Sequence, residues 1–139
     1  MSRARGQGGS AAVEVVLITP ILIALLILMV MLGRIEAARA TVDAAARDAA
    51  RAASLTADPT SAATAGADAA DASTRTAGLH CRPLTTTITQ ASAGPGGSVV
   101  ANVSCTVALG DLATGLHIPA TRTITARFAA PIDQYRSDP

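Results

Sequence analysis

The sequence predicts an α+β protein in which a long N-terminal transmembrane helix continues into an alanine-rich helical stalk and is followed by a small three-stranded antiparallel sheet. An apolar run near the N-terminus, an alanine-rich segment with helical periodicity and a C-terminal region rich in β-branched residues predict this fold class. We divide the chain into a leader peptide (1–9), a transmembrane helix (10–33), a helical stalk or hairpin (34–78) and a small β domain (79–139).

The composition leaves little material for a soluble core. Of the 139 residues, 50% are hydrophobic but only 1% are aromatic, so alanine and one apolar run supply most of the apolar side chains. The net charge of +1 gives no basic field for nucleic acid. We therefore expect the protein to act with a membrane or a protein partner.

The apolar run extends from Ala11 to Leu32 and contains one charged residue, Glu14. As a helix it would measure about 33 Å, close to the hydrocarbon thickness of a bilayer. Pro20 removes one backbone hydrogen bond, so we expect a kink there and a role for the Thr19 hydroxyl in satisfying the freed carbonyl.

Charges on the two sides of the run predict its orientation. Arg3 and Arg5 precede it, whereas Arg34 and Glu36 follow it and cancel. By the positive-inside rule, the leader is cytoplasmic and the C-terminal domain is extracytoplasmic, in a single-pass protein of the cell membrane.

Glu14 lies just inside the apolar run, where a carboxylate costs up to about 2.5 kcal/mol. Either it snorkels to the cytoplasmic face or it binds a cationic group within the membrane. The small residues Gly8, Gly9 and Ser10 precede it. If the chain were cut after Gly9, Ser10 would carry a new amino group about one helical turn before Glu14.

The stretch from Gly9 to Glu14, ahead of an apolar helix, resembles the processing motif of type IV prepilins. Residues 6–54 more narrowly resemble the start of TadE-like proteins, minor pseudopilins of tight-adherence (Flp) pilus machinery, and FAAPIDQYRS near the C-terminus also resembles members of that family. The resemblance implies cleavage after Gly9 by a prepilin peptidase and pairing of Glu14 with the new amine of a neighbouring subunit. It also implies other pilin or pseudopilin subunits and pilus assembly proteins as partners. Many TadE-like sequences have Tyr after this glutamate, where this chain has Val15.

Two alternatives stay open. Ala38-Arg39-Ala40 fits a signal peptidase site, which would release a secreted, non-catalytic binding domain beginning at Thr41. The apolar run exceeds the usual length of about 7–15 residues for a signal peptide, and charged residues crowd that site. The other alternative is an uncleaved single-pass membrane protein.

The stalk shows a heptad-like stripe with charged residues away from it. The stripe consists of Ile35, Ala38, Val42, Ala45, Ala49 and Ala52, and the charged residues are Arg39, Asp43, Arg47, Asp48 and Arg51. Asp58-Pro59 predicts a second helix start, and Pro59 to Ser73 is either a helix that folds back or a low-complexity linker. Gly66 argues against the helix.

Three β-branched runs predict strands at Leu84–Ala91, Val99–Leu109 and Thr121–Ala129, with a turn at Gly94–Gly97. We expect one weakly apolar face of this sheet to be covered by the alanine-rich helices.

In an extracytoplasmic domain, Cys81 and Cys105 are expected to form a disulfide. A turn at Pro95 and Gly96 would place Cys105 opposite Thr86, so the bridge requires a longer loop, a bulge or Cys81 folding back over the sheet.

The sequence predicts no metal, no cofactor and no catalytic site. A metal site made of His80, His117 and the two cysteines is conceivable. The spacing of these residues lacks the Cys-x-x-Cys or paired-His pattern of such sites. No nucleophile–base arrangement, phosphate-binding loop or nucleic-acid motif is legible. We therefore expect a non-enzymatic protein that supports pilus assembly.

Overall fold

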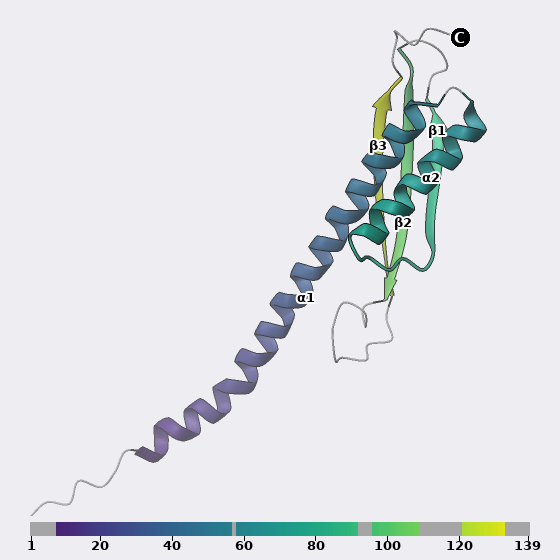
Figure 1. Ribbon diagram of the computed structural model, residues 1–139. Helices are drawn as coiled ribbons and strands as arrows, with labels where there is room; N and C mark the ends of the chain where they lie inside the picture. Colours follow the sequence, from purple (N-terminus) through teal and green to yellow (C-terminus); the bar gives the residue numbers. More distant parts are fainter. Residues whose placement is uncertain (1–7, 57, 92–95, 109–120, 133–139) are drawn as a thin grey trace, which may run out of the picture. The chain divides into compact units, whose positions relative to one another are not determined.

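In the computed structural model, the described residues are 8–56, 58–91, 96–108 and 121–132, and side chains are described from residue 13. The chain forms two helices, α1 (Gly8–Ser54) and α2 (Pro59–Thr76), and the strands β1 (Leu84–Gln90), β2 (Ser98–Ala108) and β3 (Thr121–Pro131) (Figure 1). The predicted α+β fold class is confirmed. Contacts divide the chain into a helical unit, Met1–Arg34, and a sheet unit, Ile35–Pro139.

In the helical unit, α1 exposes its apolar side chains. Val16 is 70% exposed and Met29 is 76% exposed, and Pro20 lies inside the helix. The Thr19 hydroxyl donates to the Val15 carbonyl oxygen at 2.6 Å. The carbonyl freed by Pro20 belongs to Val16 by helical geometry. Our expectation for Thr19 is therefore wrong by one residue, because its hydroxyl bonds the carbonyl four residues before Thr19 itself.

In the sheet unit, one side of α1 is buried against the sheet. The predicted stripe is confirmed at its central positions, Ala38, Val42, Ala45 and Ala49, whereas its end positions, Ile35 and Ala52, are only half-buried. The buried side is wider than predicted, since it also includes Ala46, Ala50 and Ala53. The five charged residues of the stalk, Arg39, Asp43, Arg47, Asp48 and Arg51, lie outside the buried side. The stripe thus packs within the chain, in one buried cluster with residues of the sheet and with Ala70 of α2.

The residues after Asp58 form helix α2, so the linker alternative is wrong. The Asp58 carboxylate accepts a hydrogen bond from the Ser61 backbone N–H at 2.8 Å, and Pro59 occupies the first turn. That bond, followed by the bond from the Ser61 hydroxyl, lowers the pKa of Asp58. At the other end, Gly78 adopts a φ of 70°, a conformation that favours glycine, and terminates the helix.

The three strands form an antiparallel meander in the order β1-β2-β3. Cys105 pairs with Leu84 of β1 and with Ile124 of β3. The predicted pairing of Cys105 with Thr86 is therefore wrong, because the observed register pairs Thr86 with Val103. The predicted turn at Gly94–Gly97 lies partly outside the described residues.

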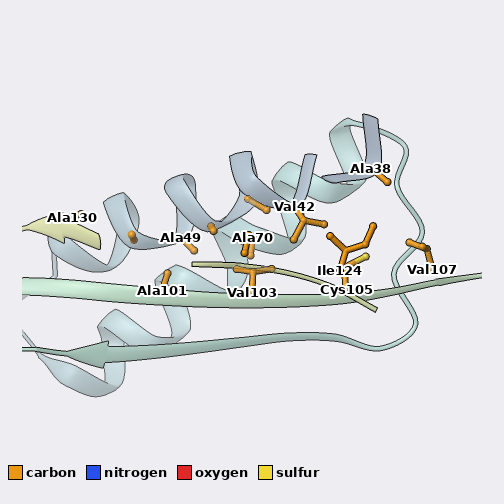
Figure 2. Packing of buried hydrophobic residues seen from close by; sticks show 14 residues of the cluster. Ala38, Val42, Ala49, Ala70, Ala101, Val103, Cys105, Val107, Ile124 and Ala130 are labelled. Atoms are coloured by element: carbon orange, nitrogen blue, oxygen red, sulfur yellow. The ribbon is translucent and has the colours of Figure 1, made fainter. Parts of the chain in front are cut away.

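The core between helices and sheet is built from small side chains. Figure 2 shows Ala38, Val42 and Ala49 of α1 and Ala70 of α2 facing Ala101, Val103 and Cys105 of β2. Ile124 and Ala130 of β3 belong to the same cluster. Small side chains bring the helices close to the sheet, which gives dense packing without aromatic residues. The expected cover of one sheet face by the alanine-rich helices is confirmed.

Candidate functional site

The apolar part of α1 is the one segment of the described chain that is long and apolar enough to cross a membrane. None of its apolar window is buried by the rest of the protein, unlike the core helix of a soluble protein. Transfer of this surface from water into a bilayer is favourable by about 25 cal/mol per Å². This exposed apolar surface fits a single-pass membrane anchor near the N-terminus.

Glu14 is exposed on this anchor among apolar neighbours. The adjacent side chains of Val13 and Val15 are 60% and 63% exposed, and Leu17 is 66% exposed. Among the residues with described side chains, none forms an ion pair with Glu14. A carboxylate in such surroundings can bind a cationic group supplied by another molecule.

The predicted cleavage site lies at the start of α1. Gly9 and Ser10 both belong to the first turn of the helix, which begins at Gly8. Residues 1–7 of the predicted leader lie outside the described residues. Cleavage after Gly9 therefore stays a prediction.

Cys81 and Cys105 form the predicted disulfide, with their Cα atoms 5.1 Å apart. The bridge forms because Leu84, and not Thr86, pairs with Cys105, which brings Cys81 within three residues of the paired position. The backbone N–H of Arg82 donates to the Thr106 carbonyl at 2.7 Å, and that of Thr106 donates to the Pro83 carbonyl at 3.1 Å. These bonds hold the residues before β1 beside β2, and Cys81 packs against the buried cluster that contains Cys105.

A shallow hollow of about 420 Å³ lies beside the disulfide. His80 and Arg82 line it together with Asp71 and Arg75, which form an ion pair at 2.7 Å. Both cysteine sulfurs are used in the disulfide, so neither is available as a thiolate ligand. His117 lies outside the described residues. The hollow therefore offers polar surface but no cluster of metal ligands within the described chain.

The sequence analysis treated the charged residues of the stalk only as residues that lie away from its apolar stripe. Arg39, Asp43 and Arg47 recur at a constant spacing with alternating sign, and all three lie outside the buried side of α1. The structure describes ion pairs from Arg39 to Glu36 and from Arg75 to Asp71, and neither Asp43 nor Arg47 takes part in one. The alternation ends at Arg51, which continues the spacing with the same sign as Arg47.

The family model of TadE-like proteins matches residues 9–51 of this chain. The matched segment includes Gly9, Ser10, Glu14, the apolar run and the charged residues of the stalk. No curated protein matches the chain, and no solved structure does so either. Residues 9–51 are therefore similar to TadE-like proteins, the family that the N-terminal motif predicted.

Proposed function

We propose that this protein is a minor pseudopilin that supports assembly of a tight-adherence pilus through helix–helix contacts in the membrane, after cleavage following Gly9. A TadE-like region on a membrane anchor fits a membrane protein associated with the Tad pilus. The observation that carries the more specific role is Glu14, a carboxylate without an ion-pair partner in the described chain, surrounded by exposed apolar side chains.

The chemistry of the site explains why cleavage and assembly would be linked. Cleavage after Gly9 creates an amino group on Ser10, which is itself unfavourable in hydrocarbon. An amine from one chain and the Glu14 carboxylate of another neutralise each other, so the contact stabilises both charges in the membrane. An uncut chain has no amine at this position, and its Glu14 stays unpaired.

The disulfide supports the proposed orientation. Disulfides persist in oxidising compartments and are rare in the cytosol. The bond between Cys81 and Cys105 thus agrees with an extracytoplasmic sheet unit and a cytoplasmic N-terminus.

The packing of α1 supports retention of the anchor. Ala38 is only 3% exposed and belongs to the same buried cluster as Val42. A cut after Ala40 would divide α1 and remove Ala38 from this core. These contacts favour the anchored protein over the alternative of a domain released at Thr41.

The experiment compares the wild-type chain with Glu14→Ala and Glu14→Gln in the native cells. We expect both variants to remain in the membrane fraction but to produce fewer pili, because neither side chain can form an ion pair with an amine. Asp68→Asn removes a carboxylate from α2, outside the buried core, and serves as the matched control. Normal piliation in both Glu14 variants would show that the proposed role of this carboxylate is wrong.

The mass of the mature wild-type chain tests processing separately. A chain beginning at Ser10 is the expected product. A start at Thr41 would identify the released domain, and a start at Met1 or Ser2 would identify the uncleaved membrane protein.

A further inference from the structure

We propose that one end of the sheet unit binds the phosphate groups of anionic lipids in the membrane that holds the anchor. We call this surface the basic end and define it by Arg39 of α1, Arg75 of α2, Arg82 before β1 and Arg122 of β3. Binding there requires the membrane anchor but neither cleavage of the leader nor the proposed function.

The basic end is the place where several elements of the sheet unit begin or end together. Arg122 pairs with Val107 in the register of β2 and β3. On the other side of β2, the backbone N–H of Arg82 donates to the Thr106 carbonyl oxygen at 2.7 Å. The Cα atoms of the two arginines are thus two strand spacings, or about 10 Å, apart. Figure 2 shows Val107 at the same end of the core as Ala38, where α1 first becomes buried.

Two hollows lie at the basic end. The first, of about 420 Å³, is lined by Arg75 and Arg82 together with His80. The second, of about 300 Å³, is lined by Arg39 and Arg122. A guanidinium donates hydrogen bonds in a fork that fits two phosphate oxygens. Each hollow therefore offers two guanidinium groups to the phosphate of one lipid.

One arginine in each hollow has no ion-pair partner within the described chain. Arg82 and Arg122 form no ion pair there, whereas the other two arginines of the basic end are paired with carboxylates of their own helices, Asp71 and Glu36. Asp43 also lines the second hollow, where it reduces the positive charge without pairing with Arg122. The charges of Arg82 and Arg122 are thus available to an anion from outside the chain.

The position of the basic end favours a lipid surface as the partner. The apolar run ends at Leu32, and Arg39 follows seven residues later on the same helix, about 10 Å along its axis. The polar layer on each side of the hydrocarbon core is about 5–7 Å thick. Long arginine side chains cover the remaining distance. The length of the chain therefore keeps these guanidinium groups within reach of lipid phosphates, and their charge favours anionic lipids.

Arg51 and Arg127 provide a contrast elsewhere on the sheet unit. Within the described residues they form no ion pair, as is the case for Arg82 and Arg122. Arg51 lies about 18 Å beyond Arg39 along α1, and Arg127 lies about 17 Å beyond Arg122 along β3. Each distance is about twice the Debye length of about 8 Å at physiological ionic strength. Charge at these two positions should therefore contribute little to lipid binding.

Fluorescence quenching by labelled lipids tests the surface in the full-length chain. The chain contains no tryptophan, so Ala77→Trp, at the exposed end of α2, introduces the only one. The protein is reconstituted into vesicles that contain a trace of lipid with a nitroxide on its headgroup. We expect stronger quenching in mixed phosphatidylglycerol and phosphatidylcholine than in phosphatidylcholine alone.

Substitutions in the Ala77→Trp chain identify the groups that bind the lipid. Arg82→Gln/Arg122→Gln should shift the equilibrium between bound and free basic ends by about tenfold or more, because one arginine near an anionic surface contributes about fivefold. Arg82→Lys/Arg122→Lys keeps both charges and should keep the quenching, which separates a loss of charge from a loss of packing.

Two further variants complete the comparison. Arg51→Gln/Arg127→Gln is the matched control, since it removes the same charge away from the basic end and should leave the quenching unchanged. Asp43→Asn removes the carboxylate from the second hollow and should strengthen the quenching in vesicles that contain phosphatidylglycerol.

Equal quenching in the two kinds of vesicle would overturn the proposal, and so would equal quenching in the parent chain and in R82Q/R122Q. A loss of pili in cells carrying R82Q/R122Q, without any effect in vesicles, would assign the basic end to an acidic protein partner and overturn the lipid assignment. The vesicles contain no other pilus protein, so failure of the lipid assignment leaves the proposed function standing.

Discussion

Gly66 of α2 lies directly against Ile88 of β1. A Cβ atom built on Gly66 would come within 2.7 Å of the Ile88 Cδ1 atom and within 3.2 Å of the Ala49 carbonyl oxygen of α1. This glycine therefore sits where α2 approaches both β1 and α1. The residue that argued against a helix in the sequence is required for the packing of that helix.

Substitution of Gly66 by alanine should destabilise the sheet unit. Overpacking costs about 1–3 kcal/mol, which exceeds the gain of about 1 kcal/mol in helix propensity. We expect a net loss of about 1 kcal/mol, measured by thermal unfolding of the full chain in detergent. Gly33→Ala is the matched control, because nothing lies within 4 Å of a Cβ at Gly33.

A double-mutant cycle assigns this loss to the contact with Ile88. Ile88→Ala removes both side-chain atoms that the new Cβ would approach most closely. In that background Gly66→Ala should be neutral or stabilising, which corresponds to a coupling of about 1–2 kcal/mol. Additive effects of the two substitutions would show that the contact does not limit the packing.

The disulfide should contribute a large part of the stability of the sheet unit. The cysteines are separated by 24 residues, and a loop of this size predicts about 3 kcal/mol in the chain-entropy model. We expect the double variant Cys81→Ala/Cys105→Ala to lose about that amount in denaturant unfolding. A reducing agent should lower the stability of the wild-type chain but not that of the double variant. Equal stability of the oxidised wild type and the double variant would refute this estimate.

The cap at Asp58 should make the stability of α2 depend on pH. Its pKa is lowered by the hydrogen bonds from Ser61, the backbone bond first, so the folded state favours the ionised carboxylate. The ionised Asp58 carboxylate stabilises the folded state above the unfolded pKa of about 3.9. This stabilisation is lost as the pH falls through the lower folded pKa. The thermal midpoint of wild type should therefore exceed that of Asp58→Asn at neutral pH, and the difference should vanish in acid. A difference that persists below this range would exclude the carboxylate as its source.

On the buried side of α1, truncation of Val42 should lower the free energy of unfolding the most. It is fully buried and is the largest side chain that α1 contributes to the cluster in Figure 2. Val42→Ala should cost about 2 kcal/mol in unfolding experiments, because the loss of two methyl groups leaves a cavity. Leu55→Ala removes more apolar atoms but from a side chain that is 67% exposed, and its effect should be within about 0.5 kcal/mol of zero. Similar losses for both variants would contradict this assignment of the core.

The fold was predictable where one local pattern decides the structure. The apolar run predicted the anchor, the Asp58-Pro59 pair predicted the start of α2, and β-branched runs predicted all three strands. Register was not predictable, because it depends on where the β1–β2 connection turns and threonines on β1 fit several alignments. The partner of the alanine stripe was not predictable either, since alanine seams fit a second chain as well as a sheet.

The residues of the candidate site could be predicted from the sequence, but their spatial arrangement could not. Glu14 stood out because it is one charge in an apolar run, and the disulfide followed from the expected compartment. The position of Cys81 beside Cys105 depends on the strand register and on backbone bonds from Arg82 and Pro83 to Thr106, which no local sequence pattern predicts. Likewise, the accessibility of Asp43 became clear only once the buried side of α1 was known.

The small side chains of the buried stripe also affect how the protein is made. The core of the sheet unit includes residues of β3, the strand furthest along the chain, so it can close only late in synthesis. Until then the stripe of α1 is exposed to water, but its alanine methyl groups offer little apolar surface area to chaperones or to other nascent chains. A core of alanine and valine therefore exposes less apolar area in the unfinished chain than a core of larger side chains would expose.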